Sequence, residues 1–388
     1  MSVSRRALFG GSAVATSGPP GALITARGRE ALVDELWPNT VDAAIVLPPA
    51  NDEIRLSSNE NPLGPGRRAL DAVREAFHDA SRYPDTTNPG IDELQNALAA
   101  ANDARPEHVL LGAGSGELLK DAVQAFTSKS KHLVTATPSY LTSARVAEYL
   151  GAEVKAIPVD RDGMLNLGAM AEASRGAGLI FVCNPNNPTG TVHGAEAIAE
   201  FVEHVQGVSP ETVIHFDEAY HEYVTDPGYR SALSLALWTP NVFVSRTFSK
   251  VYGMAGLRVG YAVGHKETIA RLRRYGLPTG ANNVGLAAAY ATFHDPVRVR
   301  REIRRNTEAR RFTINYFRKA GYEVLKSNTN FIFVNIGRPA AEMRAACREH
   351  GVRIGRDFPP MERTHARISI GTMQEMRRAT EVFTKVLA

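Results

Sequence analysis

The sequence is poor in cysteine and has no long apolar run. Its only cysteines, Cys183 and Cys347, lie far apart and have no histidine or second cysteine at metal-ligand spacing. They therefore imply neither a disulfide scaffold nor a zinc site, and we expect no metal. No stretch approaches the ~20 apolar residues that a membrane span needs. We therefore expect no membrane partner.

The chain also lacks a strong excess of charge of one sign. Its net charge is +4, and the one dense basic cluster, from Arg298 to Arg311, alternates with apolar residues. This pattern favours the solvated face of an amphipathic helix over a nucleic-acid patch. A composition of 44% hydrophobic and 22% charged residues is typical of a soluble globular protein. The length of 388 residues predicts more than one domain.

The N-terminus carries a targeting pattern rather than a structural one. Ser4–Phe9, with Arg5 and Arg6, resembles a twin-arginine export signal and precedes a run of small residues. Two prolines then interrupt the apolar region, and Ala26–Gly28 makes a poor cleavage site. Cytoplasmic and exported locations both stay open, and residues 1–30 are interpreted as a signal or a disordered terminus.

From residue 91 onward, predicted helices and strands alternate. Alternation of this kind implies crossover connections and a mainly parallel sheet covered on both faces, so the class is α/β. Beyond about residue 295, a long charged helix and several strand-like runs predict a smaller α+β domain. The strands expected in the sheet are 108–111, 132–136, 153–157, 179–183, 212–216 and 242–245, and the helices before residue 160 are 91–101, 117–127 and 141–150.

Ligands of open α/β sheets bind beyond the carboxyl ends of the strands, and a glycine-rich turn follows the first predicted strand. The N–H groups of Gly112–Gly116 and the dipole of the next helix suit a phosphate. A dinucleotide-binding loop is the rival interpretation. It would need a glycine in place of Glu117 and an acid at 135–137, where Thr-Ala-Thr stands. A plain structural turn also stays open.

Aromatic, amide and acidic side chains follow three further strands. Tyr140 could stack on a planar ligand, although simple packing is the alternative. The run Asn184–Gly190 makes a rigid turn with amides free to hydrogen-bond a ligand. Asp217 ends a buried strand, where a protonated pyridine nitrogen would be a suitable partner, and Tyr220 lies within reach of the same ligand. For the acidic motif alone, a helix N-cap is the competing interpretation.

The stretch Ser245–Arg258 is the most informative of these motifs. It places Lys250 at a strand-to-helix turn with two hydroxyls, Thr247 and Ser249, just upstream and Arg258 downstream. A lysine amine can form a Schiff base with an aldehyde cofactor, while hydroxyls and a guanidinium can bind its phosphate. An isolated Ser-Lys pair would favour an ordinary surface lysine. The four motifs described before it, each after a strand and in one order, favour the cofactor site.

Together these motifs resemble the fold-type I pyridoxal-phosphate enzymes, and among them the class I/II aminotransferases of the histidinol-phosphate aminotransferase type. The resemblance runs from about Ile54 to the C-terminus. It implies an N-terminal arm and small-domain segment over 31–60, a large domain with a mainly parallel seven-stranded sheet over 61–292, and a small domain over 293–388. The motifs that carry it are Leu56–Gly64, Arg82–Asp85, Asn184–Gly190, Asp217–Tyr220, Ser245–Arg258 and Arg367–Gly371.

The resemblance also implies roles for individual residues. Lys250 would hold pyridoxal phosphate and move a proton, and Asp217 would keep the ring nitrogen protonated so that the ring accepts negative charge. Tyr220 and Asn187 would contact the ring oxygen, and Tyr140 would stack on the ring. The phosphate ligands would be Ser115, Gly116, Thr247, Ser249 and Arg258, joined by Tyr83 from the second subunit of a homodimer.

For the substrate, the resemblance implies that Arg367 grips a carboxylate or phosphate with its bidentate fork. Arg356 would be an auxiliary charge, and Asn59 and Asn61 would lie at the substrate mouth. The expected reaction is amino transfer from an L-amino acid or amino-alcohol phosphate to a 2-oxo acid.

Two departures bear on the donor. Residues 36–50 contain no tyrosine where histidinol-phosphate enzymes carry one, and 275–283 differs from the usual proline-rich version. Both departures are compatible with a free amino acid as the donor, including an aromatic one. Decarboxylation or oxidation on the same scaffold is the alternative, since threonine-phosphate decarboxylases are similar across these motifs. A catalytically inactive regulator is the third alternative.

Overall fold

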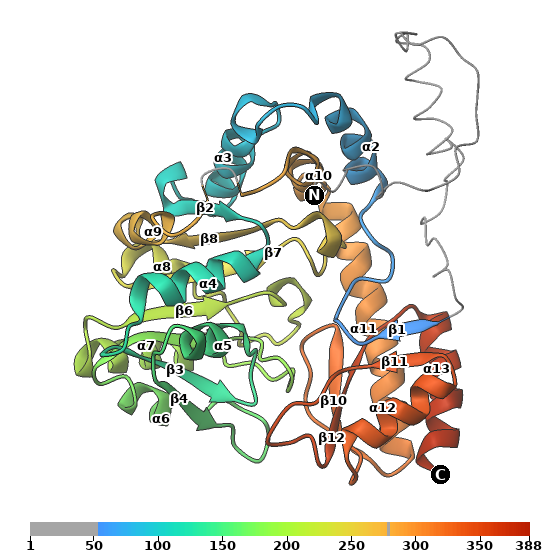
Figure 1. Ribbon diagram of the computed structural model, residues 1–388. Coiled ribbons are helices and arrows are strands. Elements are labelled where there is room, and N and C mark those ends of the chain that lie inside the picture. The colour runs from blue at the N-terminus through green and yellow to red at the C-terminus, as the bar shows by residue number, and fades with distance from the viewer. Residues whose placement is uncertain (1–52, 278–279) are drawn as a thin grey trace, which may run out of the picture. The chain divides into compact units, whose positions relative to one another are not determined.

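The computed structural model describes residues 53–277 and 280–388 (Figure 1). The predicted export signal and most of the predicted N-terminal arm lie outside the described residues. Within the described part, no helix combines the length and the apolar character that crossing a membrane requires.

A seven-stranded sheet forms the larger part of the fold, in the order β2-β8-β7-β6-β5-β3-β4. Every neighbouring pair is parallel except the two made by β8, which runs antiparallel to both β2 and β7. The predicted mainly parallel seven-stranded α/β sheet is therefore confirmed. The strands are β2 (Val109–Gly112), β3 (His132–Thr137), β4 (Val154–Pro158), β5 (Ala177–Cys183), β6 (Val213–Asp217), β7 (Val242–Thr247) and β8 (Gly260–Gly264).

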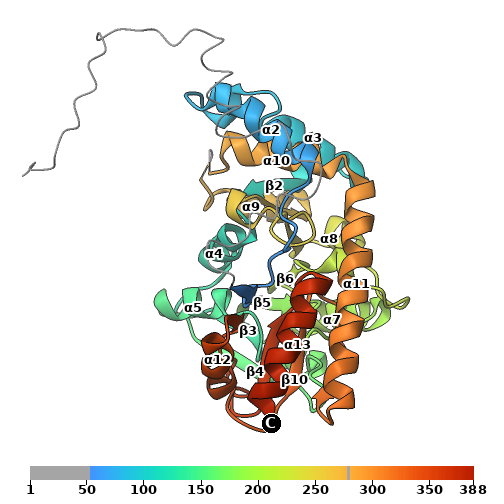
Figure 2. The same cartoon turned by 90° about the vertical axis from the view of Figure 1, so that its right-hand side faces the viewer.

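Helices cover both faces of this sheet, and the residues of β5 show why. Leu179 and Phe181 pack into one apolar cluster, whereas Ile180 and Val182 pack into the cluster on the opposite face. Alternate strand residues point to opposite faces, so a run that is apolar throughout needs cover on both. One face carries α4 (Ser115–Phe126), α5 (Thr142–Tyr149) and α9 (Lys266–Arg273), and the other carries α6 (Leu167–Glu172), α7 (Ala195–Val208) and α8 (Leu233–Trp238) (Figures 1 and 2).

A third apolar cluster lies at the β2 end of the sheet. There α10 (Asn283–Phe293) packs against α2 (Arg67–Ala76) and α3 (Ile91–Ala101) (Figure 2). Leu94 and Leu98 of α3 and Leu286 of α10 are fully buried in this cluster. The bounds of α3 agree with the predicted helix 91–101.

The C-terminal part contains two further sheets. The strand β10 (Phe331–Asn335) pairs antiparallel with β9 (Glu323–Val324) and β12 (His365–Ser369). A short parallel pair joins β1 (Ile54–Leu56) to β11 (Val352–Ile354), so residues that precede the large sheet in sequence enter the C-terminal core. Its helices are α11 (Pro296–Lys319), α12 (Ala340–Glu349) and α13 (Met373–Leu387). The domain boundaries at 61 and 293 stay predictions.

The basic helix α11 has an exposed face, but one arginine of its basic cluster is buried, which the sequence pattern does not reveal. Arg300, Arg304 and Arg311 are exposed, as a solvated face requires. Arg310, however, is buried and donates through Nη1 to the carbonyl of Thr329, at 2.6 Å. Burial lowers the pKa of its guanidinium to about 10. One arginine of the basic cluster therefore ties the helix to the loop before β10.

Candidate active site

Motif-bearing segments that follow β2, β3, β5, β6 and β7 meet at one edge of the large sheet. They line a cavity of about 1200 Å³, which exceeds the ~300–1,000 Å³ that is usual for small-molecule sites. Residues of α12, β11 and β12 and of the segment after β1 complete its wall. Of the predicted site residues, those in the wall are Asn59, Ser115, Gly116, Tyr140, Asn187, Asp217, Tyr220, Thr247, Ser249, Lys250, Arg258, Arg356 and Arg367.

Two predicted residues do not line this cavity. Asn61 is buried, and both ends of its amide hold backbone: Nδ2 donates to the carbonyl of Val251 at 2.9 Å, and Oδ1 accepts from the N–H of Leu63 at 3.0 Å. The side chain therefore braces the chain next to Lys250 rather than facing the cavity. Tyr83 is 74% exposed, and its predicted contact across a dimer stays a prediction.

Lys250 projects into the cavity from the turn after β7. Its Nζ donates to the carbonyl of Ser58 at 3.2 Å and lies 5.7 Å from the centre of the Tyr220 ring. Burial and the positive charge of Arg367 lower the pKa of this amine to about 8, although Glu60 and Asp217 oppose the shift. A substantial fraction of the amine is therefore neutral near physiological pH, as a nucleophile requires.

Asp217, at the end of β6, is the buried acid of the cavity. Burial raises the pKa of its carboxyl to about 6, while a hydrogen bond from Ser245 Oγ (3.1 Å) and the charge of Lys250 oppose this rise. A buried carboxylate is stabilised by a cation nearby. The cavity therefore offers a place for a protonated ring nitrogen.

The next residue on the chain, Glu218, turns away from the cavity. Its Oε2 accepts from Nε and Nη2 of the buried Arg246, at 3.1 and 2.9 Å. The hydroxyl of Ser231 and the N–H of Ala232 also donate to this carboxylate. The Glu218–Arg246 ion pair thus anchors the loop after β6 behind the site. The sequence pattern contained both residues but carried no signal that they would pair.

The phenol oxygen of Tyr220 already accepts two hydrogen bonds. Its Oη accepts from Asn59 Nδ2 at 3.0 Å and from Asn187 Nδ2 at 3.4 Å, and its ring meets Phe331 edge to face. Burial raises the pKa of the phenol, so the hydroxyl stays protonated. With both acceptor positions occupied, the remaining O–H can donate to a ligand in the cavity.

The glycine-rich turn forms a cradle for an anion. The helix α4 begins at Ser115, two residues earlier than predicted, so the Ser115 and Gly116 N–H groups belong to its unpaired first turn. Gly114 has φ +78°, and a Cβ there would overlap the guanidinium of Arg258. Arg258 Nη1 also donates to Ser249 Oγ at 3.3 Å. Glycine at 114 therefore lets a positive charge approach the helix N-terminus.

Arg367 comes from β12 and is only 6% exposed. Its Nη1 donates to Asn187 Oδ1 at 2.8 Å, and Nη2 donates to the carbonyl of Ser57. The buried Nε has no hydrogen-bond partner among the described residues. Burial lowers the pKa of this guanidinium to about 10, which still leaves it charged near neutral pH. It is a positioned cation with spare donor capacity.

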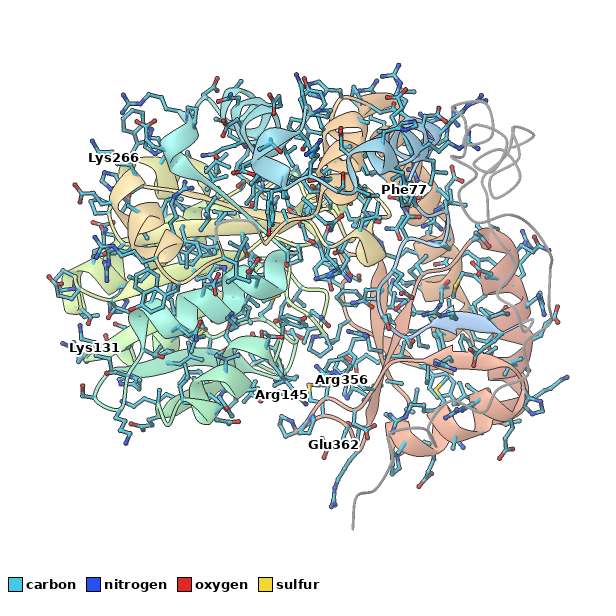
Figure 3. All side chains as sticks on the ribbon, turned by 45° about the horizontal axis from the view of Figure 1, so that its top comes forward. Phe77, Lys131, Arg145, Lys266, Arg356 and Glu362 are labelled. Carbon is cyan, nitrogen blue, oxygen red and sulfur yellow. The ribbon has the colours of Figure 1, made fainter. Side chains whose placement is uncertain are left out.

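Arg356 lies farther out. Its guanidinium stacks over the Phe358 ring at 4.2 Å, and Figure 3 shows it near Arg145 of α5. Burial, and then the charge of Arg145, lower the pKa of Arg356. Arg344 and Arg348 of α12 also line the cavity, and Arg344 pairs with Asp357. The sequence did not single out these two arginines, because two basic residues at positions i and i+4 of a charged helix resemble an ordinary solvated face.

The described groups fit pyridoxal phosphate. The cavity brings together an amine of lowered pKa, a buried carboxylate suited to a cationic ring nitrogen, and a helix N-terminus with an arginine for the phosphate. Within the described ranges, no group of three or more histidine, cysteine or acidic side chains is arranged to hold a metal ion.

Comparisons with known proteins agree with this geometry. Residues 51–383 match the family model described as "Aminotransferase class I and II". A histidinol-phosphate aminotransferase of Symbiobacterium thermophilum is 36% identical over 338 residues, covering 87% of this chain and 91% of the relative. An aromatic amino acid aminotransferase of Thermobifida fusca is 34% identical, covering 84% and 88%. The solved Sinorhizobium meliloti histidinol-phosphate aminotransferase, in complex with pyridoxal-5'-phosphate, gives a TM-score of 0.80 at 28% identity, covering 86% and 90%.

The lowered pKa of Lys250 leads to a prediction for the cofactor-free protein. Only a neutral amine attacks an aldehyde, so the rate of covalent capture of pyridoxal phosphate should rise with pH through a midpoint near 8. An ordinary lysine would give a midpoint near ~10.4. Capture can be followed by borohydride reduction and peptide mass spectrometry over a pH series. Lys250→Arg should show no capture. A midpoint near that of free lysine, or labelling at another lysine, would contradict the prediction.

Proposed function

The chain belongs to the class I and II aminotransferases and is a pyridoxal-phosphate-dependent enzyme, and we propose that it moves an amino group from a small anionic donor to a 2-oxo acid. The donor is an L-amino acid or an amino-alcohol phosphate. The observation that carries this proposal is the buried, charged Arg367, which lines the same cavity as Lys250 and Asp217.

Pyridoxal phosphate supplies an aldehyde that reacts with amines and a ring that accepts the electron pair released when a bond at the substrate Cα breaks. Asp217 holds the proton on the ring nitrogen, because its buried carboxylate is stabilised by that positive charge. Tyr220 would donate its O–H to the ring oxygen, and Asn187 would orient the same oxygen. Tyr140 would pack on the ring. The phosphate would be held by Ser115, Gly116, Thr247, Ser249 and Arg258.

Lys250 would act both as the covalent anchor and as the proton carrier. An amine whose pKa lies near the working pH can both accept and release a proton, so Lys250 would take the proton from the substrate Cα and return one on the cofactor side. The hydrogen bond to the Ser58 carbonyl orients the amine when it is free. The same segment supplies Asn59, whose amide holds Tyr220.

Arg367 binds the anionic group of the donor, and Arg356 adds a second positive charge toward the cavity mouth. Among the proteins described above, two are named for histidinol phosphate and one for aromatic amino acids. Residues 36–50 contain no tyrosine to assist in binding a substrate phosphate. This absence supports a free amino acid as donor, and a cavity of about 1200 Å³ has room for an aromatic side chain.

The enzyme acts as a homodimer in which Tyr83 contributes to the phosphate site of the other subunit. Support comes from its exposure of 74% in the single chain and its place outside that chain's own cavity.

Amino transfer predicts two separable half-reactions. Donor alone should bleach the visible absorbance of the bound cofactor once, and 2-oxoglutarate should restore it. Lys250→Ala should slow both half-reactions by at least about 10²–10⁴-fold, the usual contribution of a positioned acid–base group. Stopped-flow absorbance measures both steps. Release of CO₂ or peroxide without restoration of the absorbance would replace the transferase assignment by a decarboxylase or an oxidase.

A donor screen tests the preferred substrate, and an Arg367 variant tests the role of that side chain. Across histidinol phosphate, histidine, phenylalanine, tyrosine, arginine and glutamate, we expect an aromatic amino acid to give the highest kcat/KM. Arg367→Lys should lower kcat/KM roughly 10- to 100-fold, mainly through KM, because a point charge cannot replace the fork. Arg318→Lys, an exposed change on α11, is the control. If histidinol phosphate gave the highest kcat/KM, the proposed preference for an aromatic amino acid would be wrong.

Subunit mixing tests the role of Tyr83. Lys250→Ala and Tyr83→Ala homodimers should each be weakly active, but co-expression of the two variants should restore about a quarter of wild-type activity. Half of the dimers would then be hybrids with one intact site, as two-fold symmetry requires. If Tyr83 served the site of its own chain, or if the protein were monomeric by light scattering, no activity would be restored.

A further inference from the structure

A chain of three buried polar residues runs inward from the cavity along two neighbouring strands. Asp217 of β6 pairs in register with Ser245 of β7, and Ser245 Oγ donates to Asp217 Oδ1 at 3.1 Å. The Nε2 atom of His215 lies 2.8 Å from the same Oγ. His215 and Ser245 are fully buried, and neither lines the cavity. They do not reach the cavity themselves, and the hydrogen bond from Ser245 to Asp217 links them to it.

The hydrogen bonds determine the tautomer of His215. Ser245 has one proton and gives it to Asp217, so His215 Nε2 must donate to the serine oxygen. The opposite tautomer would make Nε2 an acceptor and take the serine proton away from the carboxylate. It would also leave an N–H at Nδ1, which is buried without a partner among the described residues. A buried donor without an acceptor is costly, so the Nε2–H tautomer is favoured.

The surroundings keep this histidine neutral and its ring in one orientation. Burial lowers the pKa of His215 to about 3, so it remains uncharged at any working pH. Its ring stacks on Phe243, with centroids 4.1 Å apart, and meets the edge of Phe181 at 5.5 Å. His215 therefore acts as a dipolar donor whose direction is set by packing.

We propose that His215 is a positioning residue that acts through Ser245 to keep Asp217 ionised and directed at the cofactor's ring nitrogen. The inference rests on the proposed role of Asp217. Without an oriented serine proton, Oδ1 would lose a donor to its charged form, and burial would favour the neutral acid. A neutral carboxyl could no longer stabilise a positive charge on the ring. Lys250, Glu218, Tyr220 and Cys183 are the other titratable groups that interact with Asp217.

The test measures the affinity of the cofactor-free protein for pyridoxal phosphate across a pH series by fluorescence titration. His215→Phe keeps an aromatic ring between Phe243 and Phe181 but removes the donor, and Ser245→Ala removes the link. Each should weaken binding roughly tenfold near neutral pH. That value is at the upper end for a neutral hydrogen bond, such as the one from His215, and at the lower end for one to a charged group, such as the one from Ser245. As the pH is lowered, the affinity of each variant should begin to fall at a higher pH than the affinity of the wild type, because Asp217 protonates more readily. His215→Gln, which places an amide N–H near the position of Nε2, should restore much of the affinity.

Two controls make the result decisive. His132→Phe changes another buried histidine of the sheet, whose Nε2 contacts the Ala173 carbonyl, and should leave the pH dependence unchanged. Asp217→Asn should weaken binding at every pH. If it does not, the proposed role of Asp217 fails. If it does while His215→Phe and Ser245→Ala behave like wild type, only the relay is wrong.

The wild-type protein provides an independent readout. Imidazole ¹⁵N spectra with assigned signals should show that His215 stays neutral across the accessible pH range, with its proton on Nε2. A proton on Nδ1 would overturn the proposal, even if His215→Phe fails to fold. If His215→Phe fails to fold, Ser245→Ala still tests the shift in affinity.

Discussion

The burial of opposite charges at one edge of a parallel sheet is the constraint on which this structure depends. Burial raises the pKa of Asp217 to about 6 and lowers that of Lys250 to about 8, so each group is less stable in its charged form than it would be in water. Hydrogen bonds from Ser245 and to Ser58 offset part of this cost. The apolar layers on both faces of the sheet provide the stability that allows such a site to exist.

The same edge depends on the C-terminal part of the chain. Arg367 enters from β12, and the pairing of β1 with β11 leads directly into the segment that carries Ser58 and Asn59. A continuous hydrogen-bonded path connects both parts: Arg367 donates to Asn187, and Asn187 and Asn59 both donate to the Tyr220 phenol. The substrate cation and the groups around the ring are therefore positioned together.

Local signals predicted most of the elements and the places of the motifs. The helix 91–101 has its predicted bounds, and the motifs that follow five of the six predicted strands line the cavity. The strand β8 was not predicted, because five residues with glycine at each end resemble a loop. Its hydrogen-bond partners are β2 and β7, and no local pattern encodes this pairing. Asn61 was predicted at the substrate mouth, yet its amide is used by backbone groups close by.

The sequence by itself determined the α/β class, the identity of the anchoring lysine and acid as candidates, and their order along the chain, because periodicity and turn chemistry are local properties. The tertiary structure decided which of these groups meet. It joined Glu218 to Arg246, placed Arg344 and Arg348 in the cavity wall, and linked His215 to Asp217 through Ser245. Hydrogen bonds and burial depend on distances between strands that are remote in sequence, and those distances exist only once the sheet has formed.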